Sequence, residues 1–202
     1  MNLRTELPTA ENSSNFNAVA DAATKAGTTL ENLKAAVAGE TGASAKYAAF
    51  AKAAKEQGFD QLARLWEATS AAEQIHINLE ASLVEAEDPS YTRPTAEAPA
   101  PEAIDLNLIA SANGEIFETS DMYPTFIKKA QEEGHAKAVK VFTRAKLAEA
   151  VHAEKYLEAY SNIDAADDDA YYLCPGCGYI HKGDDFEKCP ICGVPKAKFQ
   201  RF

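Results

Sequence analysis

Hydrophobic side chains recur with a helical period through most of the chain. Four long segments show this pattern and contain few helix breakers: residues 28–57, 60–86, 105–134 and 136–161. Thr28 and Glu31 have the spacing of a capping box, and we expect Asp60 and Asp105 to cap the second and third segments. The pattern predicts four helices.

The connections between these helices are short, long and short in turn. Gly58 and Gly134 are natural helix ends, whereas residues 87–104 contain four prolines and are typical of an extended connection. One long crossover between two helical hairpins is the connectivity of ferritin-like bundles. We therefore predict a mainly α fold, with a ferritin-like four-helix bundle over residues 28–162.

The two hairpins are related by an internal repeat. Residues 32–40 match residues 107–115 at an offset of 75, whereas Tyr47 and Tyr123 match at an offset of 76. The second half therefore contains one extra residue between Glu115 and Tyr123. One extra residue inside a helix makes a π-bulge, and such bulges favour functional sites. We expect a π-bulge in this stretch.

Acidic and histidine side chains occupy equivalent positions in the four helices. The second and fourth helices each carry a Glu-x-x-His unit and the other two each carry one glutamate: Glu73 with His76, Glu149 with His152, Glu40, and Glu115. Residues three apart share a helix face, so each unit presents a carboxylate and an imidazole to one point. Four carboxylates and two imidazoles on a bundle axis are typical of di-iron and di-manganese proteins. Glu118, inside the inserted region, is predicted as a further ligand that breaks the symmetry.

The last part of the chain, residues 171–202, is too small to fold on a hydrophobic core alone. It carries two C-P-x-C-G motifs, whose cysteines are Cys174, Cys177, Cys189 and Cys192. In a reducing compartment this spacing predicts a four-sulfur site for iron or zinc. The spacing leaves the metal open, and the neighbouring cluster favours iron. Residues 163–170 are predicted to be an acidic linker.

Composition and charge exclude several classes of function. The net charge is −11, which argues against a protein that binds nucleic acid. The longest apolar runs are too short to span a membrane, and the first eight residues lack the apolar core of a signal peptide. We expect a cytoplasmic protein. The small polar residues 1–27 are predicted to form an N-terminal extension.

Together these motifs resemble the rubrerythrin family over roughly residues 29–202. The motifs that carry the resemblance are Gly39-Glu40, Tyr47, Glu73-x-x-His76, Gly114-Glu115-x-x-Glu118 with Met122-Tyr123-Pro124, Glu149-x-x-His152 and the paired C-P-x-C-G motifs. The resemblance implies a peroxidase of oxidative-stress defence that reduces hydrogen peroxide to water. It also implies two non-haem irons in the bundle and one iron held by the four cysteines of a rubredoxin-like domain.

The resemblance assigns a role to each ligand of the iron pair. Glu73 and Glu149 resemble the two bridging carboxylates. Glu40 resembles the terminal ligand of the first iron, and Glu115 with His152 resembles the terminal ligands of the second.

The remaining site residues have implied roles that depend on oxidation state or on hydrogen bonding. Glu118 and His76 resemble alternative ligands between which the first iron moves. Tyr47 and Tyr123 resemble hydrogen-bond donors to the ligands.

The source of electrons must lie outside this chain. The sequence has no glycine-rich dinucleotide fingerprint, so we expect an electron-donor reductase, linked to NADH, or a rubredoxin-type protein. From the basic tail, the acidic bundle and the short linker, we expect a head-to-tail homodimer in which each tail reduces the di-iron site of its partner.

Two other functions remain open from the sequence. One is iron oxidation and handling, as in ferritins, for which the cysteine module has no purpose. The other is a protein-binding zinc ribbon on a structural bundle. The visible spectrum separates them from a redox relay, because a ferric four-thiolate centre is coloured and zinc is not.

Overall fold

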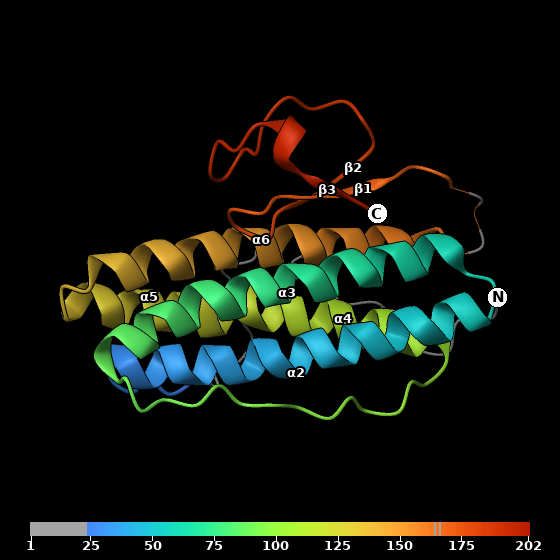
Figure 1. The fold of residues 1–202 in the computed structure, drawn as a ribbon. Helices are drawn as coiled ribbons and strands as arrows, with labels where there is room; N and C mark the ends of the chain where they lie inside the picture. Colours follow the sequence, from blue (N-terminus) through green and yellow to red (C-terminus); the bar gives the residue numbers. More distant parts are fainter. Residues whose placement is uncertain (1–23, 164, 166) are drawn as a thin grey trace.

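The computed structural model describes residues 24–163, 165 and 167–202. Long antiparallel helices form a bundle with a small domain on one side (Figure 1). The helical elements are α2 (Thr29–Glu56), α3 (Asp60–Glu87), α4 (Ile104–Phe117), the π-helix η1 (Glu118–Met122), α5 (Tyr123–Glu132) and α6 (Ala136–Ser161). The mainly α, ferritin-like fold class is confirmed. Most of the predicted extension over residues 1–27 lies outside the described residues.

The ends of the helices test the predicted caps. The capping box is present, because Thr28 accepts from the Glu31 backbone and Glu31 accepts from the Thr28 backbone at 2.7 Å. The predicted caps Asp60 and Asp105 are wrong. The capping positions are Phe59 and Ala103, so both aspartates already lie inside the first helical turn.

The connections between the helices lie where glycine and proline residues predicted them. Gly58 and Gly134 have φ angles of 81° and 70°, a left-handed conformation that glycine adopts without strain. The crossover between α3 and α4 is extended and runs along the outside of the bundle, next to α2 in Figure 1. The two hairpins therefore pack as the connectivity predicts.

The apolar core consists of two main clusters, one toward each end of the bundle. One contains Phe50, Trp66 and Tyr156, and the other contains Phe126 and Phe142. The equivalent glutamates and histidines lie between these clusters in the sequence of every long helix. The fold thus surrounds a polar centre with apolar side chains that exclude water.

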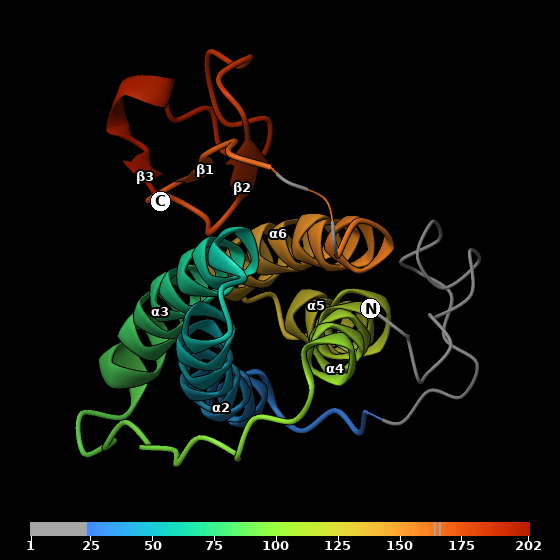
Figure 2. The same cartoon turned by 90° about the vertical axis from the view of Figure 1, so that its right-hand side faces the viewer.

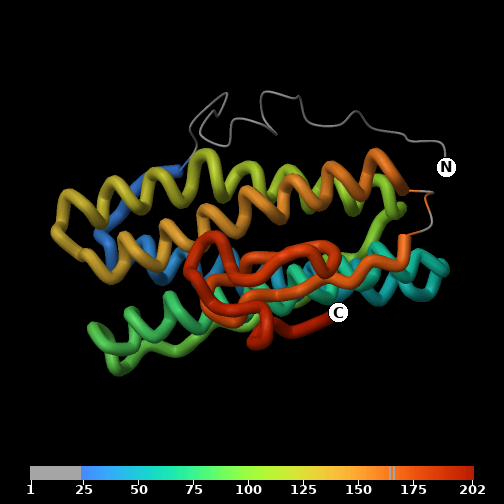
Figure 3. The backbone as a smooth tube through the Cα atoms, turned by 90° about the horizontal axis from the view of Figure 1, so that it is seen from above, coloured from blue at the N-terminus to red at the C-terminus, as the bar shows by residue number. Residues whose placement is uncertain are grey.

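The small C-terminal domain packs against the bundle. Its elements are β1 (Tyr171–Leu173), β2 (Ile180–Lys182), the 3-10 helix η2 (Lys196–Lys198) and β3 (Gln200–Arg201). The strands form an antiparallel sheet in the order β2-β1-β3. Figures 2 and 3 show that this domain lies over α3 and α6. Within the described part of the chain, no helix has the length and apolar character needed to cross a membrane.

Candidate metal centres

Six buried side chains of the bundle form two overlapping groups of possible metal ligands. In each group the ligand atoms lie within 4.8 Å of one another: Glu40, Glu73, His76 and Glu149 in the first, and Glu73, Glu115, Glu149 and His152 in the second. Each long helix supplies at least one of them. The structure therefore brings together every member of the repeated set that the sequence singled out.

Glu149 lies between the two imidazoles. Its two carboxylate oxygens are each 2.7 Å from an Nδ1 atom, one of His76 and one of His152. Glu73 also faces both rings, at 3.0 Å from His76 and 3.8 Å from His152. Glu40 lies 3.9 Å from His76, and Glu115 lies 3.7 Å from His152. Glu73 and Glu149 are thus shared, whereas the other two glutamates each face one imidazole.

The charges of this cluster are poorly balanced by the protein. Burial would raise the pKa of Glu149, but the facing imidazoles of His76 and His152 lower it to about 2. Burial, followed by repulsion from Glu73, raises the pKa of Glu115 to about 8. Burial and then repulsion from neighbouring carboxylates also raise the pKa of Glu40.

Several buried ligand atoms make no hydrogen bond of normal geometry among the described residues, although Glu149 and His152 lie within ion-pair distance of each other. They are Glu40 Oε2, Glu73 Oε1, Glu115 Oε2, both carboxylate oxygens of Glu149, and His152 Nδ1. Buried polar atoms are normally paired, because an unpaired one keeps the full cost of its desolvation. These atoms fit two cations of the kind that oxygen and imidazole ligands prefer.

The two predicted tyrosines each contact a glutamate of the ligand groups across the bundle. Tyr47 of α2 donates to Glu115 of α4, and Tyr123 of α5 donates to Glu40 of α2. Burial is the main reason that the pKa of each phenol is raised. The hydroxyl groups therefore stay protonated and fix the orientation of the carboxylates.

Glu118 lies beside the two groups but belongs to neither. It is buried, and burial followed by repulsion from Glu115 raises its pKa well above the ordinary range. It begins the π-helix η1, in which the Tyr123 backbone N–H donates to the Glu118 carbonyl. The predicted π-bulge is confirmed, and the extra residue gives this half of the bundle an acid that the other half lacks.

Glu80 is a buried acid that reasoning from the repeat missed. It is fully buried on α3, four residues after His76, and its Oε1 lies 2.9 Å from the hydroxyl oxygen of Tyr123. At the offset of 76 its counterpart is Tyr156, so the repeat gives Glu80 no matching acid. Its spacing from His76, which places it on the same helix face, is the signal that could have found it.

The four cysteines of the small domain converge as their spacing predicts. Cys174 Sγ lies 3.4 Å from Cys192 Sγ, and Cys177 Sγ lies 3.5 Å from Cys189 Sγ. All four sulfur atoms lie within 4.8 Å of one another. A hydrogen bond from Cys177 lowers the pKa of Cys174 to about 5, which favours the thiolate that a metal needs. This arrangement fits one tetrahedral iron or zinc.

The cysteine domain contacts both histidines of the bundle. His76 Nε2 lies 3.0 Å from the carbonyl oxygen of Cys177, and His152 Nε2 lies 2.9 Å from that of Gly178. Because a carbonyl only accepts, each ring donates its Nε2 proton and turns Nδ1 to the carboxylates. In the single chain the tail folds back over α3 and α6 of its own bundle, and the expectation that it reaches a neighbour's cluster more easily stays a prediction. Pairing of two chains stays a prediction.

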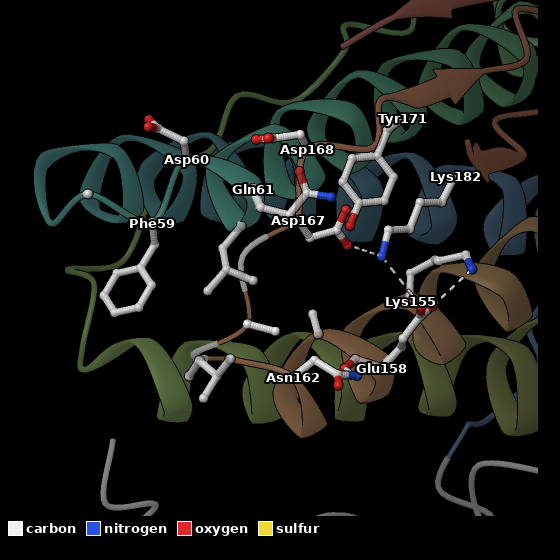
Figure 4. Close-up of a pocket in the computed structure, with 15 residues that line it drawn as sticks. Phe59, Asp60, Gln61, Lys155, Glu158, Asn162, Asp167, Asp168, Tyr171 and Lys182 are labelled. Carbon is white, nitrogen blue, oxygen red and sulfur yellow. Dashed lines mark hydrogen bonds and ion pairs between the residues drawn. The ribbon is translucent and has the colours of Figure 1, made fainter. Parts of the chain in front are cut away.

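A cavity of about 600 Å³ lies away from the two metal centres, at the end of the bundle near the linker (Figure 4). Lys182 projects into it and pairs with Glu158 at 3.5 Å and with Asp167. Lys155 pairs with the same glutamate at 3.1 Å. Lys182 thus joins Asp167 of the linker to Glu158 of α6.

Comparisons with known proteins agree with this geometry. The family model described as rubrerythrin matches residues 31–160, and the model described as the rubrerythrin rubredoxin-like domain matches residues 172–200. Nigerythrin of Nitratidesulfovibrio vulgaris is 66% identical over the full length of both chains. Rubrerythrin of the same organism is 34% identical over 87% of this chain and 95% of its own. The solved structure of fully reduced, all-ferrous nigerythrin superposes with a TM-score of 0.91 and covers both chains completely.

Proposed function

Because the chain belongs to the rubrerythrin family, we propose that it is a peroxidase that reduces hydrogen peroxide to water, with electrons passing from its cysteine domain to its bundle. The reaction consumes two electrons and two protons for each peroxide and yields two waters. Breakdown of peroxide in this way fits a role in oxidative-stress defence.

The ligand sets are those of the family: an iron pair in the bundle and one iron held by four cysteines. When bound, the iron pair supplies the two electrons and polarises the oxygen atoms of the substrate. We assign Glu73 and Glu149 as the shared ligands, because each faces both imidazoles. Glu40 and Glu115 are assigned as terminal ligands that Tyr123 and Tyr47 orient.

Glu118 and His76 are assigned as alternative ligands of the first iron. His76 lies within a four-residue ligand group, whereas Glu118 lies outside both groups. A buried carboxylate that is held close to a metal site but not within it is suited to exchange with a neighbouring ligand.

The contact between the two domains carries this proposal. The Cys177 carbonyl belongs to a cysteine ligand, and it accepts directly from His76 of the bundle site. The Gly178 carbonyl makes the same contact with His152. Two hydrogen bonds thus join the sulfur site to both imidazoles, which supports electron transfer more than it supports ferritin-like iron handling. The electrons themselves come from a donor, for which we propose an NADH-linked reductase or a rubredoxin-type protein.

Gly178→Ala tests the proposal. A Cβ at Gly178 would lie 2.4 Å from His76 Nε2, so the substitution forces the cysteine domain away from the histidines. We expect peroxidase turnover with a reduced donor to fall at least about tenfold, because electron transfer rates drop steeply with separation. Direct oxidation of the pre-reduced bundle site by peroxide, followed by stopped-flow absorbance, should keep its rate.

Gly193→Ala is the matched control. Gly193 has a φ of 78°, close to the 77° of Gly178, but no atom lies within 4 Å of its added Cβ. Equal turnover losses in the two variants would argue against the relay. Absence of the ferric-thiolate colour from anaerobically isolated native protein would instead favour a zinc ribbon.

A further inference from the structure

The cysteine domain is held against the bundle at two separate places. The first is the contact with the histidines, where the carbonyl groups of Cys177 and Gly178 accept hydrogen bonds. The second is at the far end of β2, where Lys182 enters the cavity next to the linker (Figure 4). The metal sites account for the first contact but give no role to Lys182.

The strand β2 presents alternate residues to the bundle. Ile180 is fully buried and belongs to the large apolar cluster of the bundle. Lys182, two residues later, lies on the same face of the strand. His181 faces its own domain instead, and one of its ring nitrogens lies 2.8 Å from Asp185. The side chain of Lys182 is only 18% exposed, so its charge needs partners on the bundle side.

Two carboxylates are these partners. Lys182 Nζ lies 3.5 Å from Glu158 of α6, and it also pairs with Asp167 of the linker. Asp167 is in turn tied to α3, because Arg64 donates to its backbone carbonyl at 3.2 Å. These are the two helices that carry the Glu-x-x-His units, so Lys182 links β2 to both of them.

The apolar contact alone does not fix where β2 lies along the helices. Apolar burial is non-directional, so a strand can shift along an apolar surface at little cost. Ion pairs fix the register of an interface, and salt screens them less when they are partly buried. The Asp167 side chain is 25% exposed, so its pair with Lys182 is of this kind. The lysine therefore supplies a fixed point that the apolar face lacks.

This fixed point lies close to the histidine contact. Gly178 and Lys182 are separated by four residues, which span at most about 13 Å of extended chain. Along α6, His152 and Glu158 are separated by six residues, or about 9 Å of helix. One short segment thus makes both contacts on one stretch of α6, and a shift at Lys182 moves the Gly178 carbonyl with it.

We propose that Lys182 is a positioning residue: its two ion pairs fix where β2 lies along α6, and this keeps the two backbone carbonyls on the histidines. Loss of the pairs leaves the cysteine domain on the bundle, because the apolar face remains, but it loosens the hydrogen bonds to His76 and His152. The consequence for electron transfer between the domains rests on the proposed function. The position of the domain does not, and it can be measured without turnover.

The experiment compares Lys182→Met, Lys182→Arg and the control Lys155→Met. Methionine keeps a long apolar side chain without the charge, whereas arginine keeps the charge. Lys155 pairs with the same Glu158 at 3.1 Å but lies on α6 itself. Its substitution therefore removes an equal charge from the same carboxylate without removing a link between the domains.

Two measurements are made on each variant. The first is the exchange rate of the Nε2 protons of His76 and His152 in zinc-loaded protein, by nuclear magnetic resonance. The second uses iron-loaded, fully reduced protein that is mixed with peroxide, and stopped-flow absorbance follows the return of the ferric-thiolate colour. The first reports the contact between the domains, and the second reports the electrons that leave the cysteine domain.

We expect Lys182→Met to exchange both protons at least about tenfold faster, because loss of a charged and partly buried contact favours local opening. The ferric colour should return more slowly by a similar factor. Lys182→Arg should restore most of both values, and Lys155→Met should change neither.

Wild-type exchange rates in Lys182→Met would overturn the proposal, and so would an equal effect of Lys155→Met. Complete release of the domain in Lys182→Met, seen as a larger radius of gyration by small-angle X-ray scattering, would also overturn it, because Lys182 would then bind the domain rather than position it. Faster exchange with an unchanged return of colour would support the positioning role and contradict the proposed relay. If the wild-type protein did not reduce peroxide, the proposed function would fail, while proton exchange would still decide the role of Lys182.

Discussion

Individual residues at the bundle centre carry charges that the protein alone cannot satisfy. Glu40 and Glu115 are buried, and desolvation raises the pKa of both. The imidazoles of His76 and His152 are drawn toward the charged form because Glu149 faces them, although burial opposes this. Such groups lower the stability of the metal-free protein and provide the free energy with which it binds cations.

The pKa shifts predict how the stability of the metal-free protein depends on pH. The folded pKa of about 8 for Glu80 and Glu115 lies above the unfolded value of 4.5, so the folded state binds more protons between these values. Their contribution is complete below pH 4.5 and is lost as the pH rises toward 8. The raised pKa of each histidine acts in the same direction above 6.5.

Metal-free protein should therefore melt at a lower temperature at pH 8 than at pH 5, by calorimetry at constant ionic strength. The iron-loaded protein is the control, because bound cations stabilise the deprotonated carboxylates and should reverse or remove the slope. A metal-free melting temperature that rises from pH 5 to pH 8 would contradict the assignment of these directions.

Glu118→Ala tests the residue that breaks the symmetry of the ligands. Because Glu118 lies outside both ligand groups, its loss should leave the pair of metals bound. Peroxide turnover should slow, because the proposed exchange with His76 is no longer possible. Metal analysis and steady-state kinetics with a reduced rubredoxin-type donor are the measurements. Glu73→Ala, which removes a shared ligand, should lose the pair, and wild-type turnover in Glu118→Ala would rule out the exchange.

At the scale of helices, the internal repeat predicts the position of the π-helix and of the metal ligands, which the composition of each helix alone does not. The π-helix and the six converging ligands follow from matching the two hairpins, because equivalent positions in a symmetric bundle face the same axis. Glu80 has a tyrosine, Tyr156, at the equivalent position of the other hairpin, so the repeat did not predict it. The caps Asp60 and Asp105 were misplaced because aspartate is also favourable in the first turn of a helix, where it faces the positive end of the dipole.

Deletion of Ser120 tests the purpose of the π-helix. The deletion restores an offset of 75 throughout and should convert η1 into ordinary α-helix. Glu118 would then occupy the position that Ala43 holds in the first hairpin, a buried site suited to a small side chain. We expect a lower melting temperature, and we expect Glu118→Ala to raise it more in the shortened chain than in the full-length chain. Equal effects of Glu118→Ala in the two backgrounds, by circular dichroism, would contradict this role of the bulge.

At the scale of the whole molecule, the sequence does not predict which surface of the bundle the cysteine domain contacts. The tail from residue 172 onward has five basic and three acidic side chains, whereas the complete chain has a net charge of −11. Opposite charges favour association and orient it, but they do not select a contact. The contact is made by the backbone carbonyls of Cys177 and Gly178 in the first C-P-x-C-G motif. Every residue has a backbone carbonyl, so a sequence pattern cannot predict which ones form the contact.

The same docking decides whether electrons pass within one chain or between two. A tail joined by the short linker 163–170 experiences its own bundle at a high effective concentration, which favours the contact within a chain. Ion pairs of Lys182 with Glu158 and Asp167 add to this preference. We therefore expect no recovery of peroxidase activity when a chain that ends before the tail is mixed with a full-length Glu73→Ala chain.

This mixing experiment separates the two routes because each parent lacks a different half of the relay. The truncated chain retains an intact bundle site, and the Glu73→Ala chain retains an intact cysteine domain. Native mass spectrometry serves as the control by showing whether mixed pairs form, and added rubredoxin-type donor should restore only the truncated chain. Activity that reappears in mixed pairs would show that the tail crosses to a neighbouring bundle in a head-to-tail dimer. In that case the hydrogen bonds to His76 and His152 would be made between subunits, and Gly178→Ala in the chain that supplies the tail should abolish the recovery.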